Sequence, residues 1–231
     1  VWNGQWFKWE NRNTNFLYGQ PDGGPTHDAP QNGYLNRSRV SLDYIPRDNN
    51  HPYRPAIIFR MAEAYLSYAE ALNESSERMS HKQEILDNLN KIRHRAGIAE
   101  YGTGTDENGF TRIKINFSDQ KEVRRLIHKE RRVEFVGEGV RYHDLRRWKT
   151  AHYGIGNLNE QGENPDWGVN GPDYGMNYYG TEYTDQGDNA FFKRTKYMDR
   201  VYPRKFYWYP IHQSEIDKDP TLVQGPFWLG E

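Results

Sequence analysis

The 231-residue chain contains no cysteine, which excludes disulfide bonds and thiolate metal sites. It also lacks any run of about 18 apolar residues that would cross a bilayer as a helix. Neither sign of charge prevails, since Lys and Arg number 31 and Asp and Glu 32. A balanced charge offers no electrostatic surface for nucleic acid or for an anionic membrane, so we expect neither as a partner.

Aromatic residues are plentiful, by contrast. Tyr, Phe and Trp make up 15% of the chain, although its mean hydropathy is strongly negative at −1.07. Many of the rings therefore fall in segments rich in Gly, Asn and Asp rather than in an aliphatic core. Amphipathic rings suit the edge of a core or a surface that binds something flat and polar.

Helical periodicity begins near Pro55, a residue favoured in the first turn of a helix. The apolar residues that recur at three- and four-residue spacing are Ile57, Ile58, Met61, Tyr65, Leu66, Ala69 and Leu72. A second helix is predicted over 82–96, with Gly97 as a left-handed C-terminal cap. The two helices resemble one tetratricopeptide-type hairpin, which needs stacked neighbours to bury its faces.

Two further helices are predicted after a Gly-rich excursion. The third follows Ser118, a plausible N-cap, and runs to about Val136. The fourth is short and runs from about Tyr142 to Lys149. In the proline-rich tail, Ser214–Asp217 is predicted to form one helical turn.

The remaining segments are loop-rich. Residues 1–52 are expected to form long loops with short strands or turns, and residues 151–231 a second loop-rich segment with the tail. The helical scaffold between them covers 53–150. We expect all three to belong to one domain, 1–231, of mainly α fold class with long irregular loops.

Glu130, Glu134 and Glu138 recur at four-residue spacing and place carboxylates about 5–6 Å apart on one helix face, within reach of a glycosidase pair. Arginines surround them, and an arginine holds a nearby carboxylate ionised. We therefore predict a structural ion-pair network rather than acid–base catalysis. The arginines are Arg124, Arg131, Arg132, Arg141, Arg146 and Arg147.

Other catalytic or metal signals are weak. His143 beside Asp144, with His128 nearby, has no accompanying ligand set, and no P-loop, dinucleotide fingerprint or GxSxG motif occurs. The stretch 106–109 resembles part of a calcium loop but lacks its later Glu, so a surface turn is expected. We predict no cofactor and no catalytic residue.

The aromatic loops carry the one positive binding argument. A sugar presents a C–H face that stacks on Trp or Tyr, while its hydroxyls bind polar side chains such as those of Asn170, Asp173 and Asn177. The alternative is that the rings pack the loops onto the scaffold. The candidate carbohydrate-binding residues are Trp2, Trp6, Trp9, Tyr18, Trp167, Tyr174, Tyr178 and Tyr179.

Four segments in order resemble the C-terminal portion of the SusD/RagB family of outer-membrane nutrient-binding lipoproteins. They are Ile57–Glu74 with its YAEALNE, Leu86–Gly97, Ile127–Trp148 with ER-x-x-E and DL-x-RW, and Tyr209–Gln224. The chain departs from the family at His212, where Pro is common, and at Asp219, where Asn is common. Turn chemistry tolerates both changes.

The resemblance implies the C-terminal part of a SusD-like α-α superhelix without catalytic activity. Such proteins of Bacteroidetes sit on the extracellular face of the outer membrane through a lipid anchor. They capture oligosaccharides for a SusC-like TonB-dependent transporter, in polysaccharide utilisation. The lipidated cysteine and N-terminal helices of members are missing here, so we expect a C-terminal fragment. A peptide- or protein-binding helical scaffold is the alternative, and a glycoside hydrolase ranks behind both.

Overall fold

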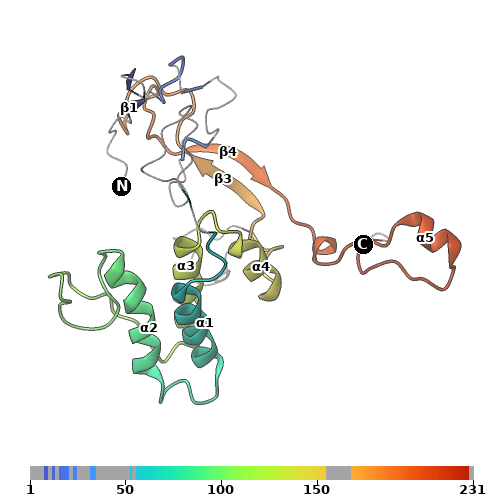
Figure 1. Cartoon of the computed structure of the whole chain (residues 1–231), viewed down its shortest axis with the longest axis horizontal. Helices are drawn as coiled ribbons and strands as arrows, with labels where there is room; N and C mark the ends of the chain where they lie inside the picture. Colours follow the sequence, from blue (N-terminus) through green and yellow to red (C-terminus); the bar gives the residue numbers. More distant parts are fainter. Residues whose placement is uncertain are drawn as a thin grey trace. The chain divides into compact units, whose positions relative to one another are not determined.

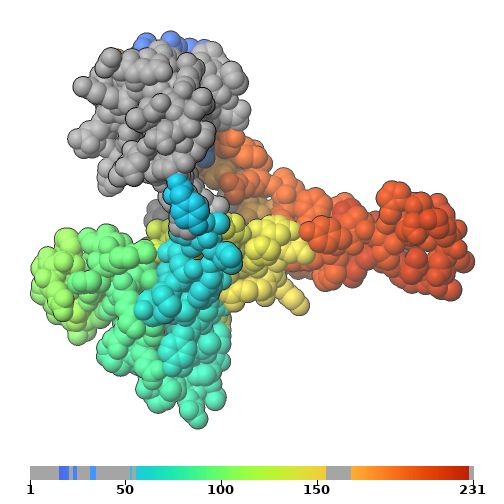
Figure 2. Space-filling model, in the orientation of Figure 1, coloured from blue at the N-terminus to red at the C-terminus, as the bar shows by residue number. Residues whose placement is uncertain are grey.

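The computed structural model describes most of the chain after residue 55 and shorter stretches before it. The described residues are 8–9, 12–13, 16–20, 23–24, 32–34, 53, 56–154 and 168–228. They form two compact units (Figures 1 and 2). The loop unit combines Val1–Pro55 with Asn170–Val201, and the helical unit combines Ala56–Val169 with Tyr202–Glu231. The single-domain organisation stays a prediction.

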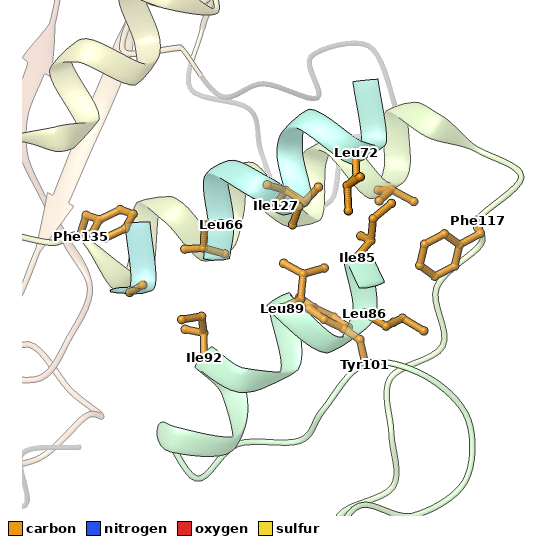
Figure 3. Close-up of a cluster of buried hydrophobic side chains, with 13 residues drawn as sticks. Leu66, Leu72, Ile85, Leu86, Leu89, Ile92, Tyr101, Phe117, Ile127 and Phe135 are labelled. Carbon is orange, nitrogen blue, oxygen red and sulfur yellow. The ribbon is translucent and has the colours of Figure 1, made fainter. Parts of the chain in front are cut away.

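The helical unit is built on three helices: α1 (Met61–Glu74), α2 (Lys82–Arg95) and α3 (Gln120–Glu134). Helix α1 contacts both of the others, and their apolar faces meet in one core (Figure 3). Of the apolar residues predicted for the first helix, Leu66, Ala69 and Leu72 lie in the core, because each helix buries one stripe. The buried core residues of the three helices are Ala62, Leu66, Ala69, Leu72, Ile85, Leu86, Leu89, Ile92, Val123 and Ile127.

The predicted start of the first helix is wrong. Helix α1 begins at Met61, and Arg60 before it is extended, with φ −140° and ψ 154°. Ile58 is 97% exposed and contributes nothing to the core. The guanidinium of Arg60 binds Glu138 and the backbone oxygen of Glu134, and these tertiary contacts hold the segment out of the helix. Pro55 lies outside the described residues.

The predicted second helix and its cap are confirmed. Helix α2 ends at Arg95, and Gly97 adopts φ +65°, a left-handed conformation that favours glycine. Its N–H donates to the carbonyl of His94, and the next N–H, of Ile98, donates to Arg93. The helix pair is present, while its tetratricopeptide-type stacking stays a prediction.

Helix α3 is capped one residue later than predicted. Asp119, not Ser118, accepts hydrogen bonds from the N–H groups of Lys121 and Glu122. A carboxylate cap also interacts favourably with the positive end of the helix dipole, which a serine does not. Helix α4 (Val140–Arg147) follows after Gly139, whose φ is +80°.

The tail of the helical unit is fixed by Arg146 of α4. Its guanidinium donates to the carbonyl oxygens of Phe206 at 2.7 Å and Tyr207 at 2.6 Å, in the 3-10 helix η1 (Arg204–Tyr207). The predicted turn in the tail is confirmed as α5 (Gln213–Lys218).

The loop unit contains a two-stranded antiparallel ribbon that the sequence did not predict. Strand β3 (Gly171–Gly175) pairs with β4 (Thr195–Arg200), with an irregular register between Asp173 and Tyr174. Gly and Pro in β3 are poor strand formers, so the sequence of this segment predicts a loop. The short strands expected before residue 52 are present as β1 (Lys8–Trp9) and β2 (Arg12–Asn13).

We predict that Ile127→Ala lowers the free energy of unfolding by about 2–5 kcal/mol, because the side chain is fully buried between α1 and α3. The control Val133→Ala, on the same helix but 63% exposed, changes it by less than about 0.5 kcal/mol. Urea unfolding followed by circular dichroism measures both. Equal losses would contradict the assignment of this core.

Candidate functional site

The candidate rings are only partly within the described residues. Trp2, Trp6 and Trp167 lie outside them, and for Trp9 only the backbone in β1 is described. Four candidates remain, all in the loop unit: Tyr18, Tyr174, Tyr178 and Tyr179. The positions of the four tryptophans as ligand contacts stay predictions.

Three of the four tyrosines form one group, here called the tyrosine cluster: Tyr18, Tyr178 and Tyr179. The ring centroids of Tyr18 and Tyr179 lie 5.3 Å apart at an interplanar angle of 49°. Tyr178 meets Tyr179 edge-on, also at 5.3 Å. Tyr179 is 67% exposed and Tyr18 37%, so the cluster presents open ring surface to solvent.

Segments far apart in the sequence build this cluster. The N–H of Tyr18 donates to the carbonyl of Gly180 at 2.9 Å, which joins the first loop to the segment after β3. Gly24 lies against the Tyr178 ring so closely that a Cβ there would be 2.6 Å from it. Any larger residue at 24 would displace that ring.

Asn177 supports the cluster through hydrogen bonds to the backbone. Its side chain is 9% exposed, donates to the carbonyl of Ala190 and accepts from the N–H of Tyr179. Asp173 is likewise engaged, in an ion pair with Arg200. Both side chains thus have partners within the scaffold, and their contact with sugar hydroxyls stays a prediction.

Tyr174 stands apart from the cluster. It lies in β3, is 41% exposed, and has the guanidinium carbon of Arg194 4.0 Å from its ring centroid. Tyr34, 55% exposed, is an open ring in the same unit that the sequence reasoning missed. The signal that marked Tyr18, an aromatic among Asn and Gly, was equally present at Tyr34.

Other rings of the loop unit serve packing. Tyr183, Phe191 and Phe192 contact one another, and Phe191 is only 3% exposed. The hydroxyl of Tyr183 accepts a hydrogen bond from the N–H of Phe16 at 2.9 Å. These three hold the loops together, as the packing alternative predicted for rings of this kind.

The predicted ion-pair network is confirmed for the three glutamates. Glu130 is buried and accepts from Arg93 at 2.6 Å and from the Tyr101 hydroxyl at 2.7 Å. Glu134 pairs with Arg60 and Arg95, and Glu138 with Arg60. The partners come from α2 and the segment before α1, not from the arginines adjacent in sequence.

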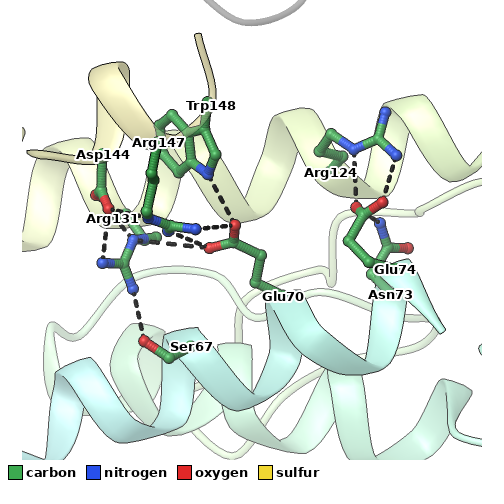
Figure 4. Close-up of polar contacts among 9 residues, drawn as sticks. All are labelled: Ser67, Glu70, Asn73, Glu74, Arg124, Arg131, Asp144, Arg147 and Trp148. Carbon is green, nitrogen blue, oxygen red and sulfur yellow. Dashed lines mark hydrogen bonds and ion pairs between the residues drawn. The ribbon is translucent and has the colours of Figure 1, made fainter.

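Two of those adjacent arginines, Arg131 and Arg147, form a second group, the Arg131 network, which joins α1, α3 and α4 (Figure 4). Arg131 binds both oxygens of Asp144 at 2.9 Å and donates to Ser67 at 3.0 Å. Arg147 binds Asp144 and Glu70, and the indole N–H of Trp148 donates to Glu70 at 2.7 Å.

His128 and the acidic turn have structural roles. His128 is 3% exposed and its ring stacks on Trp148 with centroids 3.4 Å apart. Asp106 accepts from the N–H groups of Asn108 and Phe110, which confirms the predicted surface turn. Within the described ranges, no group of three His, Asp or Glu is arranged to hold a metal ion.

The helices of the described chain are also too short or too polar for any of them to cross a membrane.

The Arg131 network shifts the ionisation of Glu70. Burial of this carboxyl opposes its charged form, but the hydrogen bonds from Arg147 and Trp148 outweigh that effect and hold the pKa of Glu70 below its ordinary value. The network therefore keeps Glu70 as a carboxylate.

Comparison with known proteins places the chain in a family. The SusD family model matches residues 3–228, and the chain belongs to this family. Two SusD-like proteins of Formosa agariphila are each 32% identical to it, over 47% and 45% of the chain. The chain spans only 18% and 19% of the length of those relatives.

A solved structure agrees with this assignment. The crystal structure of a SusD-like protein from Bacteroides fragilis superposes with a TM-score of 0.57 at 26% sequence identity. The match covers 90% of this chain and 33% of that one. The helical unit and the loop unit thus belong to a SusD-like fold.

We predict that Arg131→Met lowers the free energy of unfolding by about 3 kcal/mol, because it leaves the buried Asp144 with only Arg147 as a charged partner. The control is Arg124→Met, which removes the more exposed pair with Glu74 and costs about 1 kcal/mol or less. Urea unfolding of both variants measures the difference. A larger loss for Arg124→Met would refute the central role of Arg131.

A pH series tests Glu70. Because its folded pKa is depressed, its contribution to stability is complete above the ordinary value of 4.5 and is lost as the pH falls through the folded value. The stability difference between the wild type and Glu70→Gln should therefore shrink as the pH falls below that value. Urea midpoints at successive pH values measure it. A stability difference that stays constant as the pH falls would contradict the role of Glu70.

Proposed function

We propose that this chain is part of a non-catalytic protein that captures an oligosaccharide at the cell surface. The whole protein would be held at the extracellular face of the outer membrane by a lipid anchor. It would deliver the oligosaccharide to a SusC-like TonB-dependent transporter. Membership of the SusD family supports this role, and so does the arrangement of rings in the loop unit.

The observation that carries the proposal is the exposed pair Tyr18 and Tyr179. Two adjacent open rings give a sugar chain successive surfaces for its C–H faces, at little entropic cost because each ring has few rotatable bonds. The backbone hydrogen bond from Tyr18 to Gly180 and the amide of Asn177 fix the two rings before any ligand binds. A preformed, shallow site of this kind is suited to extended polysaccharide chains.

The charged residues support a role without catalysis. Glycoside hydrolysis needs one carboxyl that donates a proton and a second that acts as base or nucleophile. Glu130, Glu134 and Glu138 are each bound by arginine, so their geometry serves the scaffold. The hydrolase alternative therefore has no support among these three residues.

A groove favours the second candidate, a peptide- or protein-binding scaffold. It has a volume of about 880 Å³ and lies between α2 and the excursion that follows it. Its lining includes Tyr65, with the ammonium of Lys91 4.5 Å from the ring centroid, and the exposed Lys114. Capture of a protein partner without retention by any glycan would favour this candidate over sugar binding.

We also propose that the α1–α2 hairpin is of tetratricopeptide type and that both units form one SusD/RagB-like domain. The contact between α1 and α2, and the small buried residues Ala62 and Ala69 on α1, are compatible with such a hairpin.

Affinity electrophoresis in gels that contain polysaccharides tests the proposed function. We expect the double variant Tyr18→Ala/Tyr179→Ala to bind the retained polysaccharide about 10-fold or more weakly, since each aromatic stacking contact contributes about 0.5–1.5 kcal/mol. Alanine variants of Trp2, Trp6, Trp9 and Trp167, measured in the same gels, test the predicted tryptophan contacts in the loops.

The matched control is Tyr209→Ala, which removes a tyrosine 81% exposed in the helical unit. It should bind as the wild type does. Circular dichroism confirms that the helices persist in every variant. Wild-type retention in the double variant and in alanine variants of all seven tryptophans would contradict the proposal.

A further inference from the structure

The ribbon of the loop unit holds a cation on an aromatic ring. The register pairs Tyr174 of β3 with Lys196 of β4, and Arg194 lies two residues before Lys196. In an antiparallel pair such diagonal neighbours are within reach of long side chains. The guanidinium of Arg194 accordingly lies over the Tyr174 ring, 4.0 Å from its centroid.

The other cations of this ribbon are neutralised. Lys193 pairs with Asp188 at 2.8 Å and Lys196 with Asp199 at 2.6 Å, and Arg200 pairs with Asp173. Among the side chains that the structure describes in the loop unit, Arg194 is the one cation without a carboxylate partner. Its side chain is exposed to solvent.

Stacking on tyrosine orients a guanidinium without consuming its hydrogen-bond donors. The flat face of the group contacts the ring, while the N–H groups point outward along its edge. That edge matches a carboxylate or a sulfate with two parallel hydrogen bonds, and a guanidinium already held in place loses less entropy on binding.

We propose that Arg194, held by Tyr174, is an anion subsite in the same loop unit as the tyrosine cluster, so that the captured oligosaccharide is acidic. The acidic group is a uronic acid carboxylate or a sulfate ester, which present the same paired oxygens to the guanidinium. This inference rests on the proposed function and narrows its ligand to anionic saccharides.

The charge of the whole chain makes the inference specific. With a formal net charge of −1, the protein has no general attraction for polyanions. Retention by an acidic polysaccharide would therefore reflect a local site. It would weaken as salt is added, because the guanidinium edge is exposed and its interaction is screened.

Affinity electrophoresis on matched pairs of polysaccharides tests the inference. One pair is polygalacturonate and its methyl ester, and the other is a sulfated galactan and its desulfated form. We expect the wild type to bind the acidic member of one pair at least about 10-fold more tightly than the neutral member, as a charge-assisted hydrogen bond predicts. The pair whose acidic member is retained more strongly shows whether the site prefers a carboxylate or a sulfate.

Three variants accompany the wild type. Arg194→Gln removes the charge and should abolish the preference for the acidic member. Arg194→Lys keeps the charge but not the planar fork, and should retain only part of the preference. Lys193→Gln removes a neighbouring cation that is already paired with Asp188, and should leave the preference for the acidic member unchanged.

The outcomes separate this inference from the proposed function. Equal retention by the acidic and neutral members, or an unchanged preference in Arg194→Gln, overturns the anion subsite and leaves sugar capture standing. Loss of the preference in Lys193→Gln as well would show a diffuse charge effect and would also overturn it. An absence of retention by every polysaccharide overturns both.

Discussion

The buried ion pair between Arg131 and Asp144 is the constraint on which the helical unit depends. Both side chains are nearly without solvent exposure, so each buried charge requires a partner of opposite sign. Their bidentate contact fixes α4 on α3, while Ser67 and Glu70 bring α1 into the same group of contacts. Helix α4 in turn carries Arg146, which binds the carbonyl oxygens of the tail. One desolvated pair thus connects three helices, and through α4 it also supports the contacts of the tail.

This use of charge also bears on function. The carboxylates that are dense enough in sequence to resemble an active site are each bound by arginine, including Glu130, Glu134 and Glu138. Ligand recognition therefore depends on side chains that remain exposed to solvent. In the loop unit these are the open rings of Tyr18 and Tyr179 and the stacked guanidinium of Arg194, which we propose to contact a sugar and its acidic substituent.

Several elements followed from local sequence alone. The apolar spacing of α2 and the glycine after it predicted both the helix and its left-handed end. The start of α1 could not be predicted, because Arg60 takes its conformation from Glu134 and Glu138 rather than from its neighbours. The β3–β4 ribbon was missed for the opposite reason, since its pairing overrides poor local strand propensity. Composition alone likewise could not show that the amide of Asn177 binds the backbone.

The sequence by itself determined the helices of the scaffold and the apolar stripes that form its core. It also determined that the glutamates pair with arginines, and it identified the family. The helices, their stripes and the glutamates depend on residues three or four apart, and the family on motifs in a fixed order. Only the tertiary structure decided which arginine meets which carboxylate and which rings stay open to solvent. Tyr18 meets Tyr179 through a contact between distant segments, and local periodicity carries no information about such a contact.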